Sequence, residues 1–134
     1  MLPQQLRLVV VTPEKTLLDQ QVSSLRFPLY DGQIGVLPGR APLVGRLGYG
    51  ELKIHAEGRD RIYFVDGGFV QIKGETVSLL THRAIPAGEI NTAEAEEQLR
   101  QAKARPATTE VDQAAKARDL ERARQMLTVA RLSH

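Results

Sequence analysis

The stretch YDGQIGVLPGRAPLV, residues 30–44, decides the fold of this chain. It holds three glycines and two prolines within fifteen residues, and these residue types fix unusual backbone angles. Apolar residues that need a core alternate with them: Ile34, Val36, Leu37 and Leu43. Such a mixture suits a tight corner between buried strands. On spacing alone, the stretch therefore predicts a turn or β-bulge at the edge of a sheet.

Short strand patterns lie on both sides of this corner. Residues 6–11 are apolar and β-branched and end at a Thr-Pro breaker, while residues 52–56 alternate apolar and polar side chains. Further strands are expected at residues 16–18, 22–28, 62–65, 69–72 and 76–80. Glycine-containing turns are expected at residues 45–50, 58–60, 66–68 and 73–75. Many short strands with such frequent turns predict an antiparallel β-sandwich or flattened barrel.

Two helix starts can be located by their capping residues. Asn91 is followed three residues later by Glu94, and Thr109 by Asp112, so each pair combines an N-cap with an acid in the first turn. Pro106 ends the first of these helices. The full prediction is therefore a β-sandwich or flattened barrel followed by a two-helix antiparallel hairpin.

The domain limits follow from a change in composition. After residue 84, alanine and glutamine become frequent and β-branched residues thin out. We therefore expect a β-sandwich domain at residues 1–84, a linker or hinge at 85–91 and a helical hairpin at 92–134.

The apolar stripe of the last helix consists mostly of small residues. Its members are Ala123, Leu127 and Ala130, preceded by Val111, Ala115 and Leu120. Burying an alanine methyl group contributes far less than the roughly 1.5–3 kcal/mol of a buried Leu or Ile. The hairpin is therefore either a loosely held, movable element that seeks a partner or a permanently docked one, and the pattern leaves both open.

Composition and charge exclude several classes of protein. The chain has 134 residues, a formal net charge of +2 and no cysteine, so we expect neither a disulfide nor a thiolate metal site. Without a basic arm or an aromatic–basic stripe, nucleic-acid binding is not expected. Neither an export leader nor an apolar run of about eighteen residues is visible, so membrane association is expected only through a partner.

A catalytic interpretation lacks the necessary residues. The three histidines, His55, His82 and His134, have no metal-ligand spacing, and no G-x-S-x-G, P-loop or G-x-G-x-x-G motif occurs. The carboxylates considered as acid or base are all expected at turns: Asp31, Asp60 and Asp66. We therefore expect no enzymatic activity, no metal and no cofactor.

In the middle of the last helix, three arginines are interleaved with acids: Arg118, Arg122 and Arg124. Asp119 precedes Arg122 by three residues and Glu121 precedes Arg124 by three, which is typical of a solvated, salt-bridged helix face. Arg118 and Arg122, four residues apart, would instead suit an acidic surface on a partner. Spacing alone favours the solvated face.

Four segments occur in the order of one known family. They are VTPE at residues 11–14, DGQIGVLPG with APL at 31–43, GGF at 67–69 and VSLL at 77–80. Together with the length and the β-then-helix plan, they make the chain resemble the epsilon-subunit family of the F-type ATP synthases of bacteria and chloroplasts. The resemblance covers nearly the whole chain, and its most specific part is G-x-[IL]-G-[IV]-[LY]-P-G-x-A-P-L.

This resemblance implies a non-catalytic subunit of the central stalk. In that family the sandwich contacts the gamma subunit and the c-subunit ring. The hairpin either folds on the sandwich or extends toward the catalytic alpha/beta head, where it blocks ATP hydrolysis. The implied location is peripheral, on the cytoplasmic face of the bacterial plasma membrane, with membrane contact only through the complex.

The resemblance also implies particular contact residues. The contacts with the ring and gamma fall at Asp31, Gly32, Gly39, Arg40, Ala41, Pro42 and Leu43. The inhibitory contacts of the last helix fall at Arg118, Arg122 and Arg124.

Some positions depart from the family pattern. Arg40 stands where relatives commonly carry His, so no role of that imidazole is expected here. Some bacterial relatives bind ATP through an I-D-x-x-R-A signature, whereas this chain has Asn91 for the Asp and Glu94 for the Arg. Because a carboxylate in place of the cation repels phosphate, we expect poor ATP binding. The alternative function is a stand-alone β-sandwich module that binds a ligand or peptide.

Overall fold

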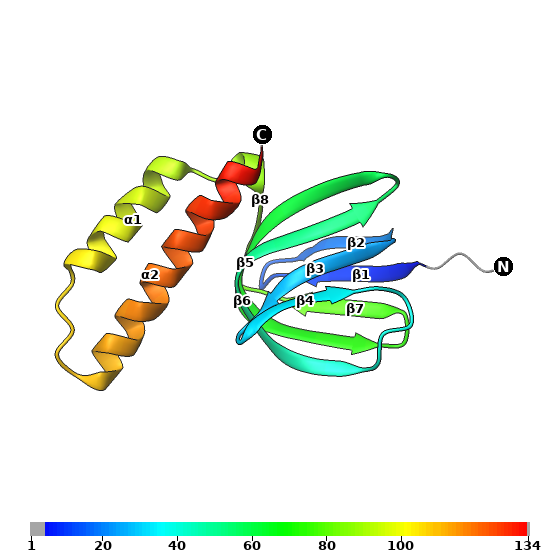
Figure 1. Cartoon of the computed structure of the whole chain (residues 1–134), viewed down its shortest axis with the longest axis horizontal. Helices are drawn as coiled ribbons and strands as arrows, with labels where there is room; N and C mark the ends of the chain where they lie inside the picture. Colours follow the sequence, from blue (N-terminus) through cyan, green and yellow to red (C-terminus); the bar gives the residue numbers. More distant parts are fainter. Residues whose placement is uncertain (1–4, 134) are drawn as a thin grey trace.

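Two long antiparallel strands, β5 (Leu43–Ala56) and β6 (Arg59–Lys73), run through the centre of the computed structural model, which describes residues 5–133 (Figure 1). Residue 1, where the predicted sandwich domain begins, and His134, where the predicted hairpin ends, lie outside these described residues. The remaining strands are β1 (Leu6–Val11), β2 (Thr16–Val22), β3 (Ser24–Leu29), β4 (Gly32–Val36), β7 (Thr76–Leu80) and β8 (Ala84–Pro86).

The strands follow the order β2-β1-β7-β6-β5-β3-β4, and β8 also pairs with β6. The sheet curls over itself into two layers (Figure 1). Leu8, Phe27 and Leu52, from three different strands, are fully buried in the core between the layers. This arrangement confirms the predicted β-sandwich, with two differences in detail. β1 and β7 are parallel, and β2 and β3 meet at Ser23, inside the strand expected at residues 22–28.

The glycines of β5 and β6 allow the strands to approach closely and do not end them. The turns predicted at residues 45–50 and 66–68 are therefore wrong, because both segments lie within strands. Gly68 shows the reason most clearly, since its φ is +120° and a Cβ there would lie 1.8 Å from the carbonyl oxygen of Leu80. Only glycine fits such a position. The strands expected at residues 62–65 and 69–72 consequently join into β6, and the one expected at 52–56 begins earlier, as β5.

The segment between the sheet and the helices has regular structure. Ala84–Pro86 forms β8 and pairs with residues 63–65 of β6, so the sheet continues into the segment expected as a linker. The 3-10 turn η1 (Ala87–Glu89) follows, and Ile90 is buried after it. β8 provides hydrogen-bond partners for backbone groups of β6 that would otherwise form an open edge.

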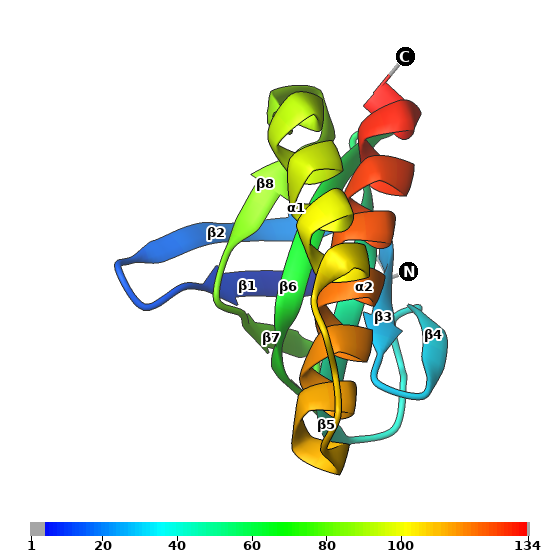
Figure 2. The ribbon, with the colours of Figure 1, turned by 90° about the vertical axis from the view of Figure 1, so that its left-hand side faces the viewer.

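Both predicted helix starts are confirmed. The helical elements are α1 (Thr92–Ala104), α2 (Glu110–Ala130) and the 3-10 turn η2 (Arg131–Ser133). Asn91 Oδ1 accepts a hydrogen bond from the backbone N–H of Glu94 at 3.0 Å, and Thr109 Oγ1 accepts one from that of Asp112 at 3.0 Å. The helices lie side by side and form the predicted hairpin (Figure 2).

The hairpin docks on the sandwich through the C-terminal half of α2. Met126 and Val129 pack with Phe64 of β6 in a second apolar cluster, separate from the sandwich core. The predicted stripe is therefore partly wrong: these two larger residues are buried beside Ala123, whereas Val111 is 78% exposed. The first half of α2 carries mostly alanine toward the sheet. The firm contact with the sandwich is therefore confined to the C-terminal end of this helix. α1 packs on the side of α2 that faces away from the sheet (Figure 1).

Candidate functional site

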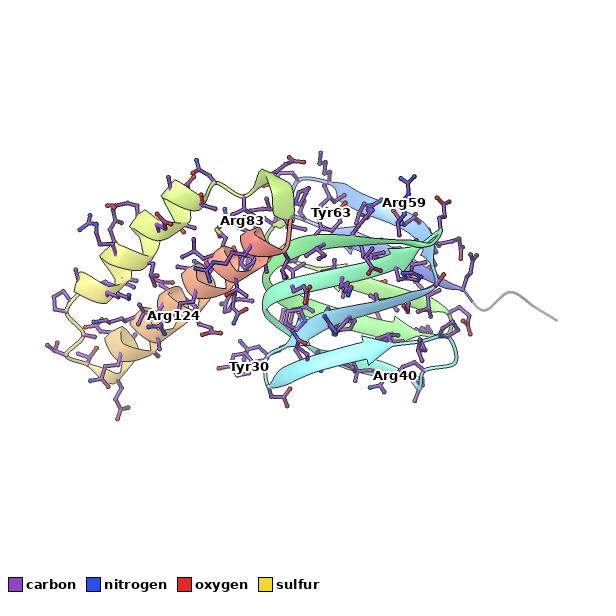
Figure 3. The ribbon with its side chains drawn as sticks, turned by 45° about the horizontal axis from the view of Figure 1, so that its top comes forward. Tyr30, Arg40, Arg59, Tyr63, Arg83 and Arg124 are labelled. Carbon is purple, nitrogen blue, oxygen red and sulfur yellow. The ribbon has the colours of Figure 1, made fainter. Side chains whose placement is uncertain are left out.

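The residues expected at the ring and gamma contacts lie at two ends of β4. Asp31 lies in the exposed β3–β4 turn, and Gly32 begins β4. The others occupy the β4–β5 loop and the first residue of β5: Gly39, Arg40, Ala41, Pro42 and Leu43. Figure 3 marks the two ends by Tyr30 and Arg40. Since β4 lies between them, the two groups are about 15 Å apart and form two separate contact regions.

A group of exposed apolar side chains lies on the outside of the sheet, from the β3–β4 turn to the start of β5. It consists of Tyr30, Val44, Phe69 and Leu80 around Arg46, and we call these five residues the outer sheet face. The four apolar residues are between 50% and 79% exposed. Arg46 pairs with Phe69 and Phe69 with Leu80 across neighbouring strands, so these side chains share one face. The guanidinium of Arg46 lies 4.3 Å from the ring centroid of Tyr30.

Sequence reasoning missed the outer sheet face, although part of the signal was present. Val70 and Ile72 face the core, so the alternation of β6 directs Phe69 and Gln71 outward. An aromatic residue at an outward position indicates a contact surface. For Leu80 the sequence gives no comparable signal, because its neighbours depend on how β7 pairs with β6.

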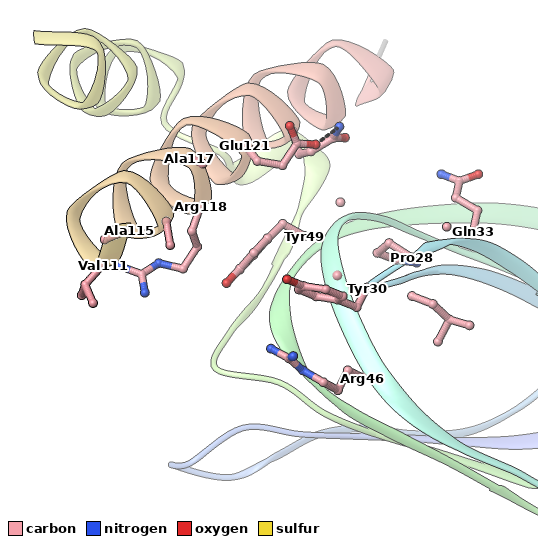
Figure 4. A pocket seen from close by; sticks show the side chains of 16 residues that line it. Pro28, Tyr30, Gln33, Arg46, Tyr49, Val111, Ala115, Ala117, Arg118 and Glu121 are labelled. Atoms are coloured by element: carbon pink, nitrogen blue, oxygen red, sulfur yellow. Dashed lines mark hydrogen bonds between the residues drawn. The ribbon is translucent and has the colours of Figure 1, made fainter. Parts of the chain in front are cut away.

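An open crevice of about 830 Å³ lies between the first half of α2 and the strands (Figure 4). Arg118 of α2 and Tyr30, Arg46 and Tyr49 of the sandwich line it and direct their polar ends toward it. The space remains open because α2 faces it with the small side chains of Ala114, Ala115 and Ala117. The crevice therefore connects the outer sheet face with the helical hairpin.

An ion cluster around a buried aspartate joins the sandwich to the hairpin. Asp66, which was expected in a turn, lies inside β6 and is 6% exposed, so that prediction is wrong, as is the one for Asp60, which also lies in β6. Asp66 Oδ1 accepts a hydrogen bond from Arg122 Nε at 2.9 Å, and Oδ2 accepts one from Arg83 Nε at 3.1 Å. We call Asp66, Arg83 and Arg122 the Asp66 cluster. No sequence signal could pair Asp66 with a residue 56 positions away.

The three arginines of α2 occupy different surroundings. Arg122 is half-buried in the Asp66 cluster, and its guanidinium lies 5.3 Å from the ring centroid of Tyr49. Arg118 is exposed at the crevice. Arg124 is also exposed, but two residues along a helix turn it by about 200° from Arg122. In this docked form, the three side chains therefore do not form one cationic face.

The two ion pairs expected on this helix have different outcomes. The pair of Asp119 with Arg122 is present, with 3.6 Å between Oδ1 and Nη1. Glu121 instead accepts a hydrogen bond from Gln125 at 2.9 Å. Within residues 5–133, Arg124 has no ion pair, so its guanidinium is free to meet another molecule.

Residues 5–87, which include every strand of the described sheet, match the family of the ATP synthase, Delta/Epsilon chain, beta-sandwich domain. The chain belongs to this family. The ATP synthase epsilon chain of Rhodopirellula baltica is 42% identical over 126 residues, which cover 94% of this chain and 98% of that relative. The one of Granulibacter bethesdensis is 40% identical over 108 residues, which cover 79% of each chain.

Solved ATP synthase structures share the fold of this delta/epsilon-family chain. A chain of the Euglena gracilis mitochondrial ATP synthase, in an OSCP/F1/c-ring structure, superposes with a TM-score of 0.83 at 25% identity, covering 98% of this chain and 84% of that one. A chain of the Tetrahymena thermophila mitochondrial enzyme, in a central stalk/c-ring structure, gives 0.76 at 14% identity and covers 97% and 99%.

This chain is thus a non-catalytic, epsilon-type subunit of an ATP synthase. It associates with a membrane through that complex. Within residues 5–133, neither helix is long and apolar enough to cross a membrane.

Proposed function

We propose that the sandwich of this chain binds the gamma subunit and the c-subunit ring in the central stalk, and that the hairpin restrains ATP hydrolysis by the catalytic head. The Euglena chain with the same fold comes from a structure that includes F1 and the c-ring, which supports these partners. The proposed location is the cytoplasmic face of a bacterial plasma membrane. Membership in the ATP synthase family leaves no ground for the alternative of a stand-alone binding module.

The observation that carries the proposal is the outer sheet face. Large apolar side chains exposed next to one another are costly in water and are typical of a surface that a partner covers. Tyr30 and Arg46 are residue types that often dominate the binding energy of protein interfaces. Four of the five side chains project from paired strands, and Tyr30 is held against Arg46 by its backbone N–H and its ring, so the surface is already formed before binding. Such a preformed surface suits a permanent partner, and we assign it to gamma.

The two ends of β4 provide the remaining sandwich contacts in this proposal. Asp31, in the exposed β3–β4 turn, and Gly32, the first residue of β4, would meet the polar loops of the ring. The loop contacts near the stalk are Gly39, Arg40, Ala41, Pro42 and Leu43. Because the two groups lie at opposite ends of a strand, they are suited to two different partners.

The inhibitory contacts are assigned to the arginines of α2. Guanidinium groups bind carboxylates through two parallel hydrogen bonds, so Arg118, Arg122 and Arg124 suit the acidic segments of the alpha/beta head. In the docked form Arg122 is bound to Asp66. The hairpin must therefore leave the sandwich before that residue can contact the head.

The first experiment tests the restraint of hydrolysis. ATP hydrolysis is measured for the assembled enzyme with the full-length chain and with a chain that ends at Glu89. This cut retains β8, which pairs with β6, whereas a cut at Arg83 would remove it. A several-fold rise in hydrolysis, with the truncated chain still bound to gamma, supports an inhibitory hairpin. Unchanged hydrolysis would reject it and leave only the coupling role of the sandwich.

The second experiment tests the outer sheet face. Phe69→Asp places a charge at the centre of the exposed apolar group and is expected to weaken gamma binding by about thirtyfold or more. The matched control is Val111→Asp, which adds the same charge at an exposed apolar position of α2. Equal loss of gamma in both variants, or in neither, would contradict the assignment of the face.

A further inference from the structure

We infer that Asp66 is the lock that holds the hairpin on the sandwich, because its carboxylate binds one guanidinium before the hairpin and one within it. Among residues 5–132, Asp66 and Thr81 are the buried polar residues. A buried carboxylate requires cations and hydrogen-bond donors around it. The two cations beside Asp66 are Arg83, which precedes the hairpin, and Arg122, which lies within it. Their relative position would change if the hairpin moved.

One half of the Asp66 cluster belongs to the sandwich. Arg83 donates from Nε to Asp66 Oδ2 at 3.1 Å and directly precedes β8. The backbone N–H of Asp66 donates to Thr81 Oγ1 at 3.1 Å and to the carbonyl of Arg83 at 3.2 Å. Thr81 Oγ1 in turn donates to the same carbonyl at 3.2 Å. These contacts fix the carboxylate and the start of the connection to α1, whatever the position of the helices.

The other half belongs to the hairpin. Arg122 donates from Nε to Asp66 Oδ1 at 2.9 Å, and 31% of its side chain is exposed. Its guanidinium also contacts Tyr49 of β5 and Asp119 of α2. Along α2, Arg122 follows Arg118, which lines the open crevice, and precedes Met126 of the apolar cluster. The ion pair is therefore placed at the edge of the docked interface, where a releasable contact is expected.

The presence of two arginines gives this carboxylate two stable states. If the hairpin leaves, Arg83 still donates to the Asp66 carboxylate and Thr81 still accepts the backbone N–H of Asp66, so the charge keeps a cationic partner. Release therefore breaks one charge-assisted hydrogen bond and the apolar contacts of α2, and the sandwich stays folded. With a single arginine, release would leave a buried unpaired carboxylate, which is strongly destabilising.

A consequence for regulation follows, and it rests on the proposed function. Arg122 is also one of the arginines assigned to the acidic surface of the catalytic head. One guanidinium cannot be docked on Asp66 and bound to that surface at the same time. Asp66 therefore competes with the head for Arg122 and determines how readily the hairpin extends.

The test of the lock uses amide hydrogen exchange of the isolated full-length chain. Because most of the stability of a helix in a protein comes from tertiary packing, faster exchange in α2 reports release of the hairpin. Asp66→Asn is expected to accelerate α2 exchange by about tenfold or more, with β1 still protected. The matched control is Asp19→Asn, which removes a carboxylate that accepts two hydrogen bonds from Arg7 within the β1–β2 pair. If amide exchange in α2 accelerates equally in both variants, the inference that Asp66 holds the hairpin is wrong.

A second pair of variants covers the case in which Asp66→Asn does not fold. Arg122→Gln leaves Asp66 paired with Arg83 and is expected to accelerate α2 exchange, whereas Arg118→Gln, one turn earlier on the same helix, is not. Where both single variants fold, Asp66→Asn with Arg122→Gln should exchange no faster than the faster single variant. Acceleration by Arg118→Gln equal to that by Arg122→Gln, or additive effects in the double variant, would overturn the inference.

These exchange measurements involve no partner, so their outcome is independent of the proposed function. A separate measurement on the assembled enzyme addresses the competition. There Asp66→Asn is expected to lower ATP hydrolysis several-fold, because Arg122 becomes available to the head. If hydrolysis is unchanged while α2 exchanges faster, Asp66 holds the hairpin on the sandwich but does not compete with the head for Arg122. If the truncation after Glu89 also leaves hydrolysis unchanged, the proposed inhibition itself has failed.

Discussion

Arg105, which directly follows α1, donates a hydrogen bond from Nη2 to Oδ2 of Asp119 on α2 at 2.8 Å. Its backbone carbonyl accepts a second hydrogen bond from Lys116 Nζ at 2.9 Å. These contacts join the helices at the end of the hairpin that lies away from the sandwich (Figure 1). The apolar cluster around Met126 holds the other end. At the Arg105 end, the two helices are thus joined independently of their docking on the sandwich.

Acid is expected to loosen this far end of the hairpin. Burial raises the pKa of Asp119, but hydrogen bonds from Arg105 and Arg118 outweigh it and hold the pKa below its ordinary value. Since the pKa is lower in the folded than in the unfolded chain, the stabilisation is complete above about pH 4 and is lost as the pH falls further. Amide exchange around Asp119 should therefore change little between about pH 7 and pH 5, apart from the intrinsic rate, and should rise near pH 3.

Asp119→Asn is the control for this acid step. The variant should remove the step and lower stability at neutral pH by about 1 kcal/mol or less, because the ion pair is partly exposed. Glu97 provides a comparison, since hydrogen bonds from Arg100 and Gln101 lower its pKa to about 2. A step that persists in Asp119→Asn would have to be assigned to such another carboxylate.

Gly68→Ala is expected to destabilise the sandwich severely. A Cβ at this position would lie 1.8 Å from the carbonyl oxygen of Leu80, and the φ of +120° is itself strained for alanine. We expect a loss of about 3 kcal/mol or more in the free energy of unfolding, measured by urea denaturation. Gly35→Ala is the matched control, because nothing lies within 4 Å of a Cβ there. A cost similar to that of the control would show that β6 and β7 can separate at this point.

The fold was predictable where local chemistry decides it. The caps at Asn91 and Thr109 depend on residues three positions away, and both helix starts were correct. The turn expected at residues 66–68 was wrong because glycine serves two purposes that one sequence cannot distinguish. It ends strands at turns, and it also permits close approach within strands, as at Gly68. Which of the two applies depends on the neighbouring strand, here β7.

The candidate site was predictable only in part, for the same reason. The exposed loop residues around Arg40 lie where a Gly/Pro-rich segment places them, at the surface. Asp66 could not be recognised, because its two cations come from distant segments that meet only in the folded chain. The stripe of α2 was misassigned because its helical period allowed several faces of similar low hydrophobicity. Tertiary contacts with Phe64 selected the face that contains Met126.

Met126→Ala is expected to weaken docking of the hairpin without unfolding the sandwich. Met126 is 4% exposed and belongs to the cluster with Phe64, separate from the sandwich core. A core truncation of this kind costs about 2–5 kcal/mol, and here the cost falls on the docked state. α2 exchange should accelerate while β1 stays protected. Val111→Ala, on the same helix but 78% exposed, should have little effect. Loss of β1 protection in Met126→Ala would show that the two clusters form one cooperative unit.

The isolated chain is expected to bind ATP poorly. The N-terminus of α1 would attract phosphate through its free N–H groups. Here, however, Asn91 already accepts the N–H of Glu94. Three carboxylates also surround this end of the helix: Glu94, Glu96 and Glu97. A calorimetric titration should show no saturable binding at about millimolar ATP, the weak end of specific affinities. Tight binding by the unmodified chain would contradict this expectation.

Restoring the signature of ATP-binding relatives tests the reason. Asn91→Asp together with Glu94→Arg replaces a repelling carboxylate by a guanidinium that can form two hydrogen bonds with phosphate. The double variant should therefore bind ATP at least about tenfold more tightly than the parent chain, which corresponds to one good charge-assisted contact. Asn91→Asp with Glu96→Arg is the matched control, since it makes the same change in charge two residues further along α1, on a different side of the helix. If the control binds ATP equally well, the net charge of the helix end, and not the position of Glu94, explains the weak binding.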